Sequence, residues 1–157
     1  MHSYDIIDRF DRAILALLQK DARLTNNELS EQVNLSPSQC SRRRTRLEDD
    51  GLIAGYHAKL DREKVGLGIV TIINVTLATH NPDNSKRFAA LISDLPEVQE
   101  AHALTGEMDY FIKVVAPDLN GLREFVNDVL LPHESVQNVK TSIVLETLKD
   151  TSSLPLG

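Results

Sequence analysis

The chain has 157 residues, of which 41% are hydrophobic and 25% charged, and this excludes a large multidomain enzyme as well as collagen-like, low-complexity and disordered chains. Its formal charge of −6 is unevenly distributed, because residues 1–60 carry nine Lys/Arg and nine Asp/Glu whereas residues 61–157 carry eight and fourteen. The overall acidity therefore does not exclude a nucleic-acid partner, for which a local basic surface matters more than the total charge.

Three helices are predicted in the first 50 residues. Apolar residues at spacings of three and four predict an amphipathic helix over residues 5–21. Thr25 and Glu28 form a capping-box pattern that begins a short second helix. Ser36 as N-cap, followed directly by a proline, predicts a third helix over residues 37–49.

From residue 52 the pattern changes to extended segments separated by helices. Residues 53–60 are predicted as a short strand and residues 61–68 as a polar linker. Four strands follow, with one helix after the turn at residues 81–83 and one after Asp118; the strands are expected at residues 69–79, 98–105, 110–116 and 139–148. The order strand, helix, strand, strand, helix, strand is that of a ferredoxin-like βαββαβ domain.

The sequence thus predicts an α+β chain with two domains. The first, over residues 1–60, is a helix-turn-helix, winged-helix-like domain that includes the short strand. A linker over residues 61–68 leads to the ferredoxin-like domain, which takes residues 69–157.

The third predicted helix has the properties of a DNA-reading helix. The major groove of B-form DNA admits one helix, whose N-terminal and outer side chains reach the base edges. Arginine suits guanine or phosphate, glutamine pairs with adenine, and hydroxyls bond phosphate oxygens. Cys40, Arg44 and Leu47 share one stripe that must face the other helices. The residues predicted to contact DNA are Ser36, Ser38, Gln39, Ser41, Arg42, Arg43, Thr45 and Arg46.

An alternative interpretation of the arginines is a solvated helix face. In that case they would pair with the acids that follow, Glu48, Asp49 and Asp50. On the inner stripe, Cys40 is interpreted as a small buried core residue, and Arg44 is expected to pack its aliphatic stem while its charged head turns outward.

Residues 8–15, 24–30, 35–43 and 46–53 are similar to the DNA-binding half of one known family, and the sequence thereby resembles the Lrp/AsnC (feast/famine) transcriptional regulators. The resemblance continues with Thr105-Gly106-Glu107-Met108-Asp109-Tyr110, which matches the family's Gly-Asp/Glu-x-Asp-Tyr/Phe loop. The similarity extends over essentially the whole chain.

The resemblance implies partners that composition and periodicity do not. It implies double-stranded DNA, homodimers formed through the strand at residues 53–60 and the sheets, octamers, and an amino acid bound between subunits near the loop. Carboxylates suit the ligand's ammonium, and backbone N–H groups or hydroxyls suit its carboxylate. The residues expected to bind this effector are Gly106, Glu107, Met108, Asp109, Tyr110, Thr141 and Ser142. Taken alone, the loop would be a plain hairpin connection with solvated acids.

Other classes of function are less compatible with the sequence. The five histidines are scattered without metal-ligand spacing, and there is no Gly-rich phosphate loop, so we expect no enzyme, no metal and no cofactor. A single cysteine, no signal-peptide pattern and no apolar run long enough to span a bilayer predict a soluble cytoplasmic protein without a membrane partner. The main alternative is an architectural, oligomeric DNA-binding protein that has no effector.

Overall fold

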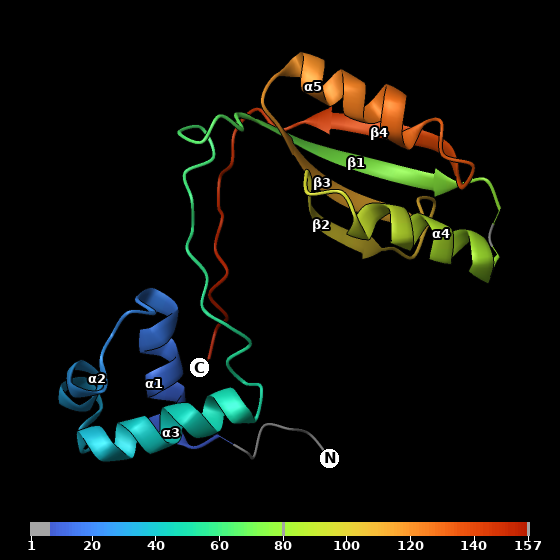
Figure 1. Cartoon of the computed structure of the whole chain (residues 1–157). Helices are drawn as coiled ribbons and strands as arrows, with labels where there is room; N and C mark the ends of the chain where they lie inside the picture. Colours follow the sequence, from blue (N-terminus) through green and yellow to red (C-terminus); the bar gives the residue numbers. More distant parts are fainter. Residues whose placement is uncertain (1–6, 80, 157) are drawn as a thin grey trace. The chain divides into compact units, whose positions relative to one another are not determined.

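The computed structural model describes residues 7–79 and 81–156, and the chain forms two compact units (Figure 1). One unit contains Met1–Lys59 together with Lys149–Gly157, and the other contains Leu60–Leu148. Within the described residues, no helix is both long enough and apolar enough to cross a lipid bilayer. Each unit has its own hydrophobic cluster, so each is described by itself.

The first unit is built from three helices, α1 (Arg9–Lys20), α2 (Asn26–Val33) and α3 (Pro37–Asp49). The structure confirms the predicted third helix at both ends. The three helices bury one apolar side each, and burial of such side chains contributes about 1.5–3 kcal/mol apiece. The resulting cluster consists of Ile14, Leu15, Leu18, Leu29, Val33, Cys40 and Leu47.

Each of these helices begins at a capping box. Asp8, Thr25 and Ser36 accept hydrogen bonds from the backbone N–H three positions on, and the side chain found there bonds back to the cap. The Asp8 cap explains why α1 begins at Arg9 and not at residue 5 as predicted; residues 5 and 6 lie outside the described part of the chain. Between α2 and α3, Asn34 takes a left-handed backbone conformation with φ of 56°, which asparagine tolerates and which turns the chain sharply.

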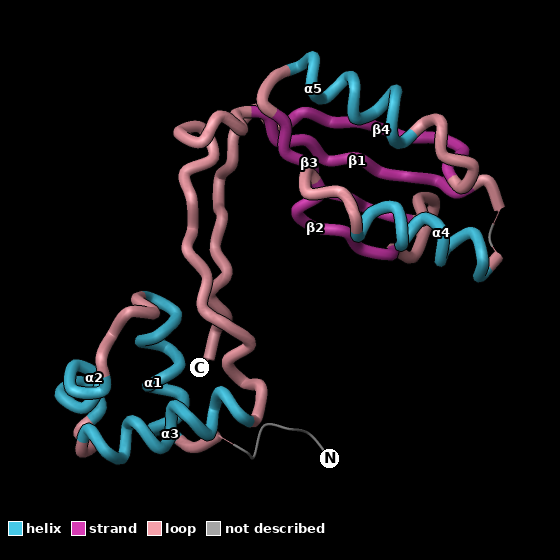
Figure 2. Tube along the Cα trace, in the orientation of Figure 1, coloured by secondary structure: helices cyan, strands magenta, loops and turns pink. Residues whose placement is uncertain are grey.

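The strand predicted at residues 53–60 is absent from the described chain, which runs there as an extended loop (Figure 2). The Ile53 N–H bonds the Leu47 carbonyl at 3.0 Å, but beyond this point no neighbouring strand supplies a ladder of backbone hydrogen bonds. The contact that the structure gives this segment at its end is an ion pair of Lys59 Nζ with Asp150 Oδ2 at 3.0 Å. The segment is therefore extended but forms no strand, because it has no strand partner within the described chain.

The C-terminal tail belongs to the helical unit, although the sequence places it with the second domain. The Gln19 side chain bonds both backbone groups of Leu154, and the Arg12 guanidinium donates to the Leu156 carbonyl at 3.1 Å. The Leu156 side chain also packs against the helical cluster. These contacts, which join residues more than 130 positions apart, hold the tail on α1.

The second unit is a four-stranded antiparallel sheet in the order β2-β3-β1-β4, as a ferredoxin-like fold requires. Figure 1 shows its two helices, α4 (Pro82–Ser93) and α5 (Leu119–Glu124), along this sheet. The strands are β1 (Ile69–Leu77), β2 (Val98–Ala103), β3 (Tyr110–Ala116) and β4 (Val136–Ile143).

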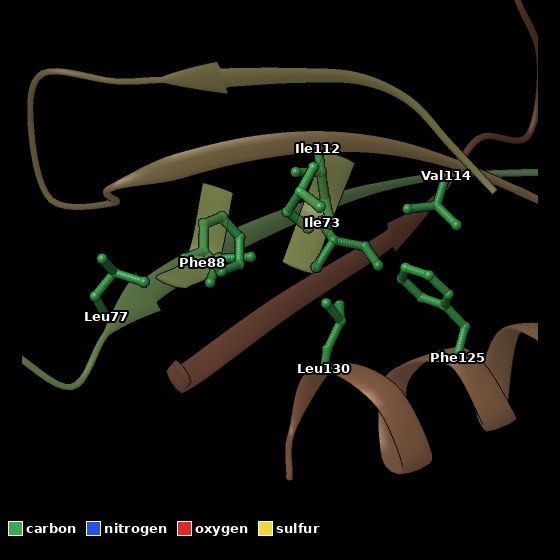
Figure 3. Packing of buried hydrophobic residues seen from close by; sticks show 9 residues of the cluster. Ile73, Leu77, Phe88, Ile112, Val114, Phe125 and Leu130 are labelled. Atoms are coloured by element: carbon green, nitrogen blue, oxygen red, sulfur yellow. The ribbon is translucent and has the colours of Figure 1, made fainter. Parts of the chain in front are cut away.

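The core of this unit lies between the sheet and the helices (Figure 3). Ile73 and Ile112 face each other across β1 and β3 and are fully buried. Phe88 of α4 covers them from the helix side, and its ring lies 4.7 Å from that of Tyr110. The cluster consists of Ile73, Val75, Leu77, Phe88, Ile92, Ile112, Val114, Phe125 and Leu130.

Several boundaries in this unit differ from the prediction: β1 ends at Leu77 and not at residue 79, and β2 ends at Ala103 and not at residue 105. After α5 the chain continues as π-helical turns over Phe125–Leu130, where the Leu131 N–H bonds the Val126 carbonyl five residues back. The last strand occupies Val136–Ile143 and not residues 139–148: it pairs with β1 from Leu77 opposite Val136 to Thr71 opposite Ile143, and a last backbone bond runs from the Val144 N–H to the Val70 carbonyl at 2.9 Å.

Candidate functional site

One face of α3 is exposed and polar, and the opposite face is buried. Cys40 and Leu47 are fully buried, which confirms the predicted inner stripe at these two positions. Burial raises the pKa of the Cys40 thiol, which is consistent with a core residue rather than a reactive one. The exposed residues on the outer face include Ser38, Gln39, Ser41, Arg42, Thr45 and Arg46.

Ser36 and Gln39, two of the residues predicted to contact DNA, form the capping box at the start of α3. Ser36 Oγ accepts from the Gln39 N–H at 3.2 Å, and Gln39 Oε1 accepts from the Ser36 N–H at 2.9 Å. Ser36 and Gln39 are therefore fixed in position by the helix start itself, and the first turn of α3 is held rigid where a groove contact would need it.

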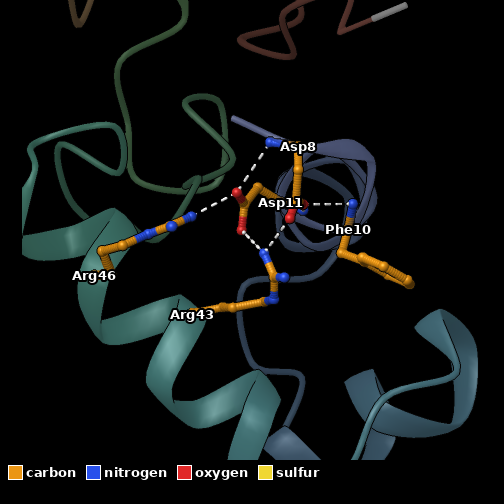
Figure 4. A network of polar contacts seen from close by, with 5 residues as sticks. All are labelled: Asp8, Phe10, Asp11, Arg43 and Arg46. Atoms are coloured by element: carbon orange, nitrogen blue, oxygen red, sulfur yellow. Dashed lines mark hydrogen bonds and ion pairs between the residues drawn. The ribbon is translucent and has the colours of Figure 1, made fainter. Parts of the chain in front are cut away.

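Arg43 and Arg46, both in the predicted DNA-contacting set, bond the N-terminus of α1 (Figure 4). Arg43 Nη1 lies 2.8 Å from Asp11 Oδ1 and 2.8 Å from Asp8 Oδ2. Arg46 Nη2 pairs with the other oxygen of Asp11. The Asp11 side chain is 1% exposed, whereas that of Arg46 remains 47% exposed. Two of the four arginines are thus paired with carboxylates of the α1 N-terminus.

Arg44 corrects the expectation for the inner stripe, because its head does not turn to solvent. Its guanidinium donates to the Leu24 carbonyl at 2.9 Å and to the Tyr56 hydroxyl at 3.0 Å, and it pairs with Glu48 at 3.2 Å. Burial, together with the hydrogen bond to Glu48, raises the pKa of Tyr56. The Arg44 guanidinium therefore bonds the α1–α2 connection at Leu24 and the segment after α3 at Tyr56.

Arg42 differs from the other three arginines. Its side chain is exposed, and among the described residues no ion pair or hydrogen bond of its guanidinium is found. Of the ion pairs that the solvated-face alternative expects with the following acids, the described chain forms Arg44–Glu48. Arg42 therefore carries the unpaired positive charge of the α3 surface.

Asp11 was not among the residues singled out from the sequence, although a signal was present. It lies three, four and seven positions before Ile14, Leu15 and Leu18, so that it occupies the apolar stripe of α1. A carboxylate on such a stripe requires a buried partner, and the arginines of α3 provide one. The position in the pattern indicates the need for a partner, but the identity of that partner depends on how α3 packs.

The N-cap of α1 gives a prediction about pH. The Asp11 N–H bond, followed by the Arg43 guanidinium, lowers the pKa of Asp8 below its ordinary value of 3.8. Because the folded-state pKa is the lower one, the ionised Asp8 stabilises the unit above pH 3.8, and this contribution is lost as the pH falls through the folded-state pKa. In urea unfolding, Asp8→Asn should therefore be less stable than the parent at pH 7, with the gap closing below pH 4. A gap that stays constant down to pH 3 would contradict this assignment.

The predicted effector loop joins β2 to β3 and is fixed by one of its own acids. Asp109 Oδ2 accepts from the Leu77 N–H at 2.7 Å, and the Asp109 N–H donates to the Val75 carbonyl at 3.0 Å. Gly106 has a φ of 122°, which side-chain-bearing residues rarely adopt, and Glu107 is exposed. Asp109 thus anchors the loop to the end of β1.

The remaining predicted effector residues are not gathered at this loop within the chain. Met108 accepts a 3.3 Å contact from the Thr76 hydroxyl, and the Tyr110 ring packs on Phe88 in the core. Thr141 and Ser142 pair with Ile73 and Ile72 of β1, so they project from opposite faces of the sheet, with β1 between them and the loop. Residues 106–109 form one cluster, and the two β4 residues lie apart from it.

Comparisons with known proteins agree with both units. A family model described as the Lrp/AsnC ligand binding domain matches residues 70–154, and one described as winged helix-turn-helix DNA-binding matches residues 7–54. The leucine-responsive regulatory protein of Salmonella typhimurium is 38% identical over 148 residues, which cover 94% of this chain and 90% of that protein.

Solved structures give the same result. The crystal structure of a transcriptional regulator from Neisseria meningitidis in complex with L-Met is 45% identical, with a TM-score of 0.92, and covers 96% of this chain and 97% of its own. The structure of Escherichia coli AsnC is 27% identical, with a TM-score of 0.87, and covers 95% of this chain and 99% of its own. The chain therefore belongs to the Lrp/AsnC family of DNA-binding transcriptional regulators.

Proposed function

We propose that this regulator reads a specific DNA sequence with α3 and that Arg42 is its principal cationic contact. The observation that carries the proposal is the exposed, unpaired Arg42 guanidinium on the outer face of a rigidly capped helix. Ser38, Ser41 and Thr45 supply hydroxyls on the same face for phosphate or base contacts. Arg43 and Arg46 are assigned instead to holding α3 on α1.

The DNA-bound form is proposed to be a symmetric homodimer, and larger assemblies such as octamers are built from it. Two copies of α3 then enter successive major grooves about 34 Å apart, or a multiple of this distance. The segment at residues 53–60 is extended and has no strand partner within the described chain, so it is suited to pair with the same segment of a second copy.

An amino acid is the proposed effector, and its binding changes DNA affinity or assembly. The family of the second unit is a ligand-binding one, and the relative from Neisseria meningitidis was crystallised with L-Met. Glu107 and Asp109 offer carboxylates to an ammonium, and the Gly106 backbone suits a carboxylate. By linkage, a ligand that binds one assembly better shifts the equilibrium toward it.

DNA recognition is tested by selection from a random pool. The purified chain is incubated with duplexes carrying a randomised central 30 base pairs, and retained duplexes are sequenced over several rounds. A sequence with two related half-sites separated by a whole number of helical turns is the expected outcome. Retention without enrichment of any sequence would support an architectural DNA-binding protein, and no retention at low salt would refute DNA binding by α3.

The effector is tested by thermal unfolding with each of the twenty amino acids, with and without the selected duplex. A ligand present at 100 times its Kd stabilises the native state by about 2.7 kcal/mol, which is readily measured as a rise in Tm. No shift with any amino acid, in either condition, would favour the alternative without an effector.

Asp109 gives a sharper test of the effector loop. Asp109→Asn keeps an oxygen for the Leu77 N–H and removes the charge, whereas Asp109→Ala also leaves that N–H unpaired, at a cost of about 1–3 kcal/mol. We therefore expect the asparagine variant to unfold near the parent's Tm but to lose the amino-acid-induced shift, while still binding the selected duplex. The alanine variant should lose both stability and response. An asparagine variant with the parent's full response would exclude a role for the Asp109 charge.

A further inference from the structure

The strongest unassigned feature is the buried carboxylate that joins α1 to α3. Asp11 is 1% exposed and accepts from the Asp8 N–H at 3.1 Å, from Arg43 at 2.8 Å and from Arg46 (Figure 4). Burying a carboxylate is costly unless it is paired and hydrogen-bonded, and here both of its oxygens have partners. The site is therefore completely satisfied only when α3 is seated with both arginines turned toward α1.

The two arginines differ in how firmly they are held. Arg43 bridges Asp8 and Asp11, its guanidinium carbon lies 5.4 Å from the centre of the Phe10 ring, and its side chain is 24% exposed. Arg46 has Asp11 as its carboxylate partner and keeps a 47% exposed side chain. Because residues four apart share a helix face, Arg46 lies one turn beyond Arg42 on the side proposed to meet DNA.

We propose that Asp11 is a positioning residue that sets the specificity of DNA reading. It fixes the rotation of α3 on α1 through Arg43, and it withdraws the Arg46 charge from the surface beside Arg42. Phosphate contacts strengthen binding to every sequence alike, so withdrawing Arg46 lowers affinity for all DNA, whereas the fixed rotation of α3 aligns its side chains with base edges and so favours the specific sequence. This inference rests on the proposed function of α3 and assigns to α1 a part in it.

The test uses Asp11→Asn, which preserves size and one acceptor oxygen but removes the charge and replaces the second acceptor with an NH2 donor. Binding is measured from 50 to 200 mM salt on the duplex selected by the parent and on a random-sequence duplex of equal length. Each released Arg46 adds a phosphate contact, which steepens the slope of log affinity against log salt on random DNA by about 0.9 per subunit, an additional loss of affinity of about 3.5-fold between 50 and 200 mM salt. The preference for the selected duplex should fall as well, because α3 is no longer held through the Asp11–Arg43 ion pair in the rotation that presents its side chains to base edges. A variant that stays folded with an unchanged or shallower salt dependence would overturn the inference.

A second pair of variants keeps the test decisive if Asp11→Asn does not fold. In the parent background Arg46→Gln should leave the salt dependence on random DNA unchanged, because Asp11 already holds that charge. Arg42→Gln, the matched control with the same change one turn away, should make the dependence shallower. If Arg46→Gln reduces it as much as Arg42→Gln does, Arg46 is on phosphate and the inference is wrong.

Failure of the inference is distinguishable from failure of the proposed function. If Arg42→Gln binds both duplexes as the parent does, α3 is not the DNA-reading surface, and both proposals are overturned. If Arg42→Gln weakens binding while the Asp11 and Arg46 variants behave contrary to expectation, DNA reading by α3 stands and only the role of Asp11 is refuted.

Discussion

Phe88→Ala is expected to lower the free energy of unfolding of the second unit by about 3–5 kcal/mol, which is the usual cost of emptying a phenylalanine site in a core. The Phe88 side chain is 1% exposed and is the largest fully buried one in the structure. It lies between α4 and the sheet (Figure 3), and the alanine variant also loses the contact of the Phe88 ring with the Tyr110 ring. Because small domains have only about 5–15 kcal/mol of net stability, urea unfolding followed by circular dichroism should show a large shift of midpoint.

The two-unit organisation makes this effect local. Cys40, the single cysteine, is fully buried in the helical cluster, and burial raises the pKa of its thiol. Its reaction with a thiol reagent therefore reports on opening of the helical unit alone. In Phe88→Ala the reaction of Cys40 should stay as slow as in the parent. Leu119→Ala is the control for the second unit: because Leu119 is 60% exposed, this substitution should change the free energy of unfolding by less than about 0.5 kcal/mol. Rapid Cys40 reaction in Phe88→Ala would show that the two units unfold together.

Local signals account for the elements that the sequence predicted well. The ends of α3 follow from Ser36, the proline after it and the glycine at position 51, whose φ of 72° ends the helix. Both ends of β3 agree with the prediction, because charged and turn-forming residues directly precede and follow the strand. In both cases the decisive residues lie within the element or next to it.

Elements that depend on a distant partner were predicted less well. The last strand starts three residues earlier than expected, where the turn after the π-helical segment brings Val136 opposite Leu77. Residues 53–60 are extended but have no strand partner within the described chain, and the tail joins the helical unit through Gln19 and Arg12. No local pattern encodes these pairings, since each needs the position of a segment far away in the sequence.

The same reason limits prediction of the site. The four arginines are equivalent as a cluster in the sequence, yet the structure gives Arg43 and Arg46 to Asp11, Arg44 to the Leu24 carbonyl, and leaves Arg42 exposed. Asp11 lies 32 and 35 positions before its partners. Helical spacing can assign a face to each arginine, but only the packing of α1 against α3 separates the unpaired cation from the cations that are paired within the fold.

Arg42→Ala should cause the largest loss of DNA affinity of any single substitution on α3. A lost arginine contact costs about 1–3 kcal/mol, which in a dimer acts in both subunits, and a lost phosphate contact lowers the salt slope by about 0.9 per subunit. Stability should change little, because the Arg42 side chain is exposed and unpaired within the described chain. Fluorescence anisotropy on the selected and random duplexes, at several salt concentrations, measures both quantities.

The pattern of loss identifies what Arg42 contacts. Equal weakening on both duplexes, with a shallower salt slope, indicates phosphate, whereas weakening confined to the selected duplex indicates a base edge. Arg123→Ala is the matched control, because it removes the same charge from a 66% exposed side chain on α5 of the other unit and should leave binding unchanged. If Arg42→Ala keeps the parent's affinity and salt slope on both duplexes, the exposed face of α3 is not the surface that meets DNA.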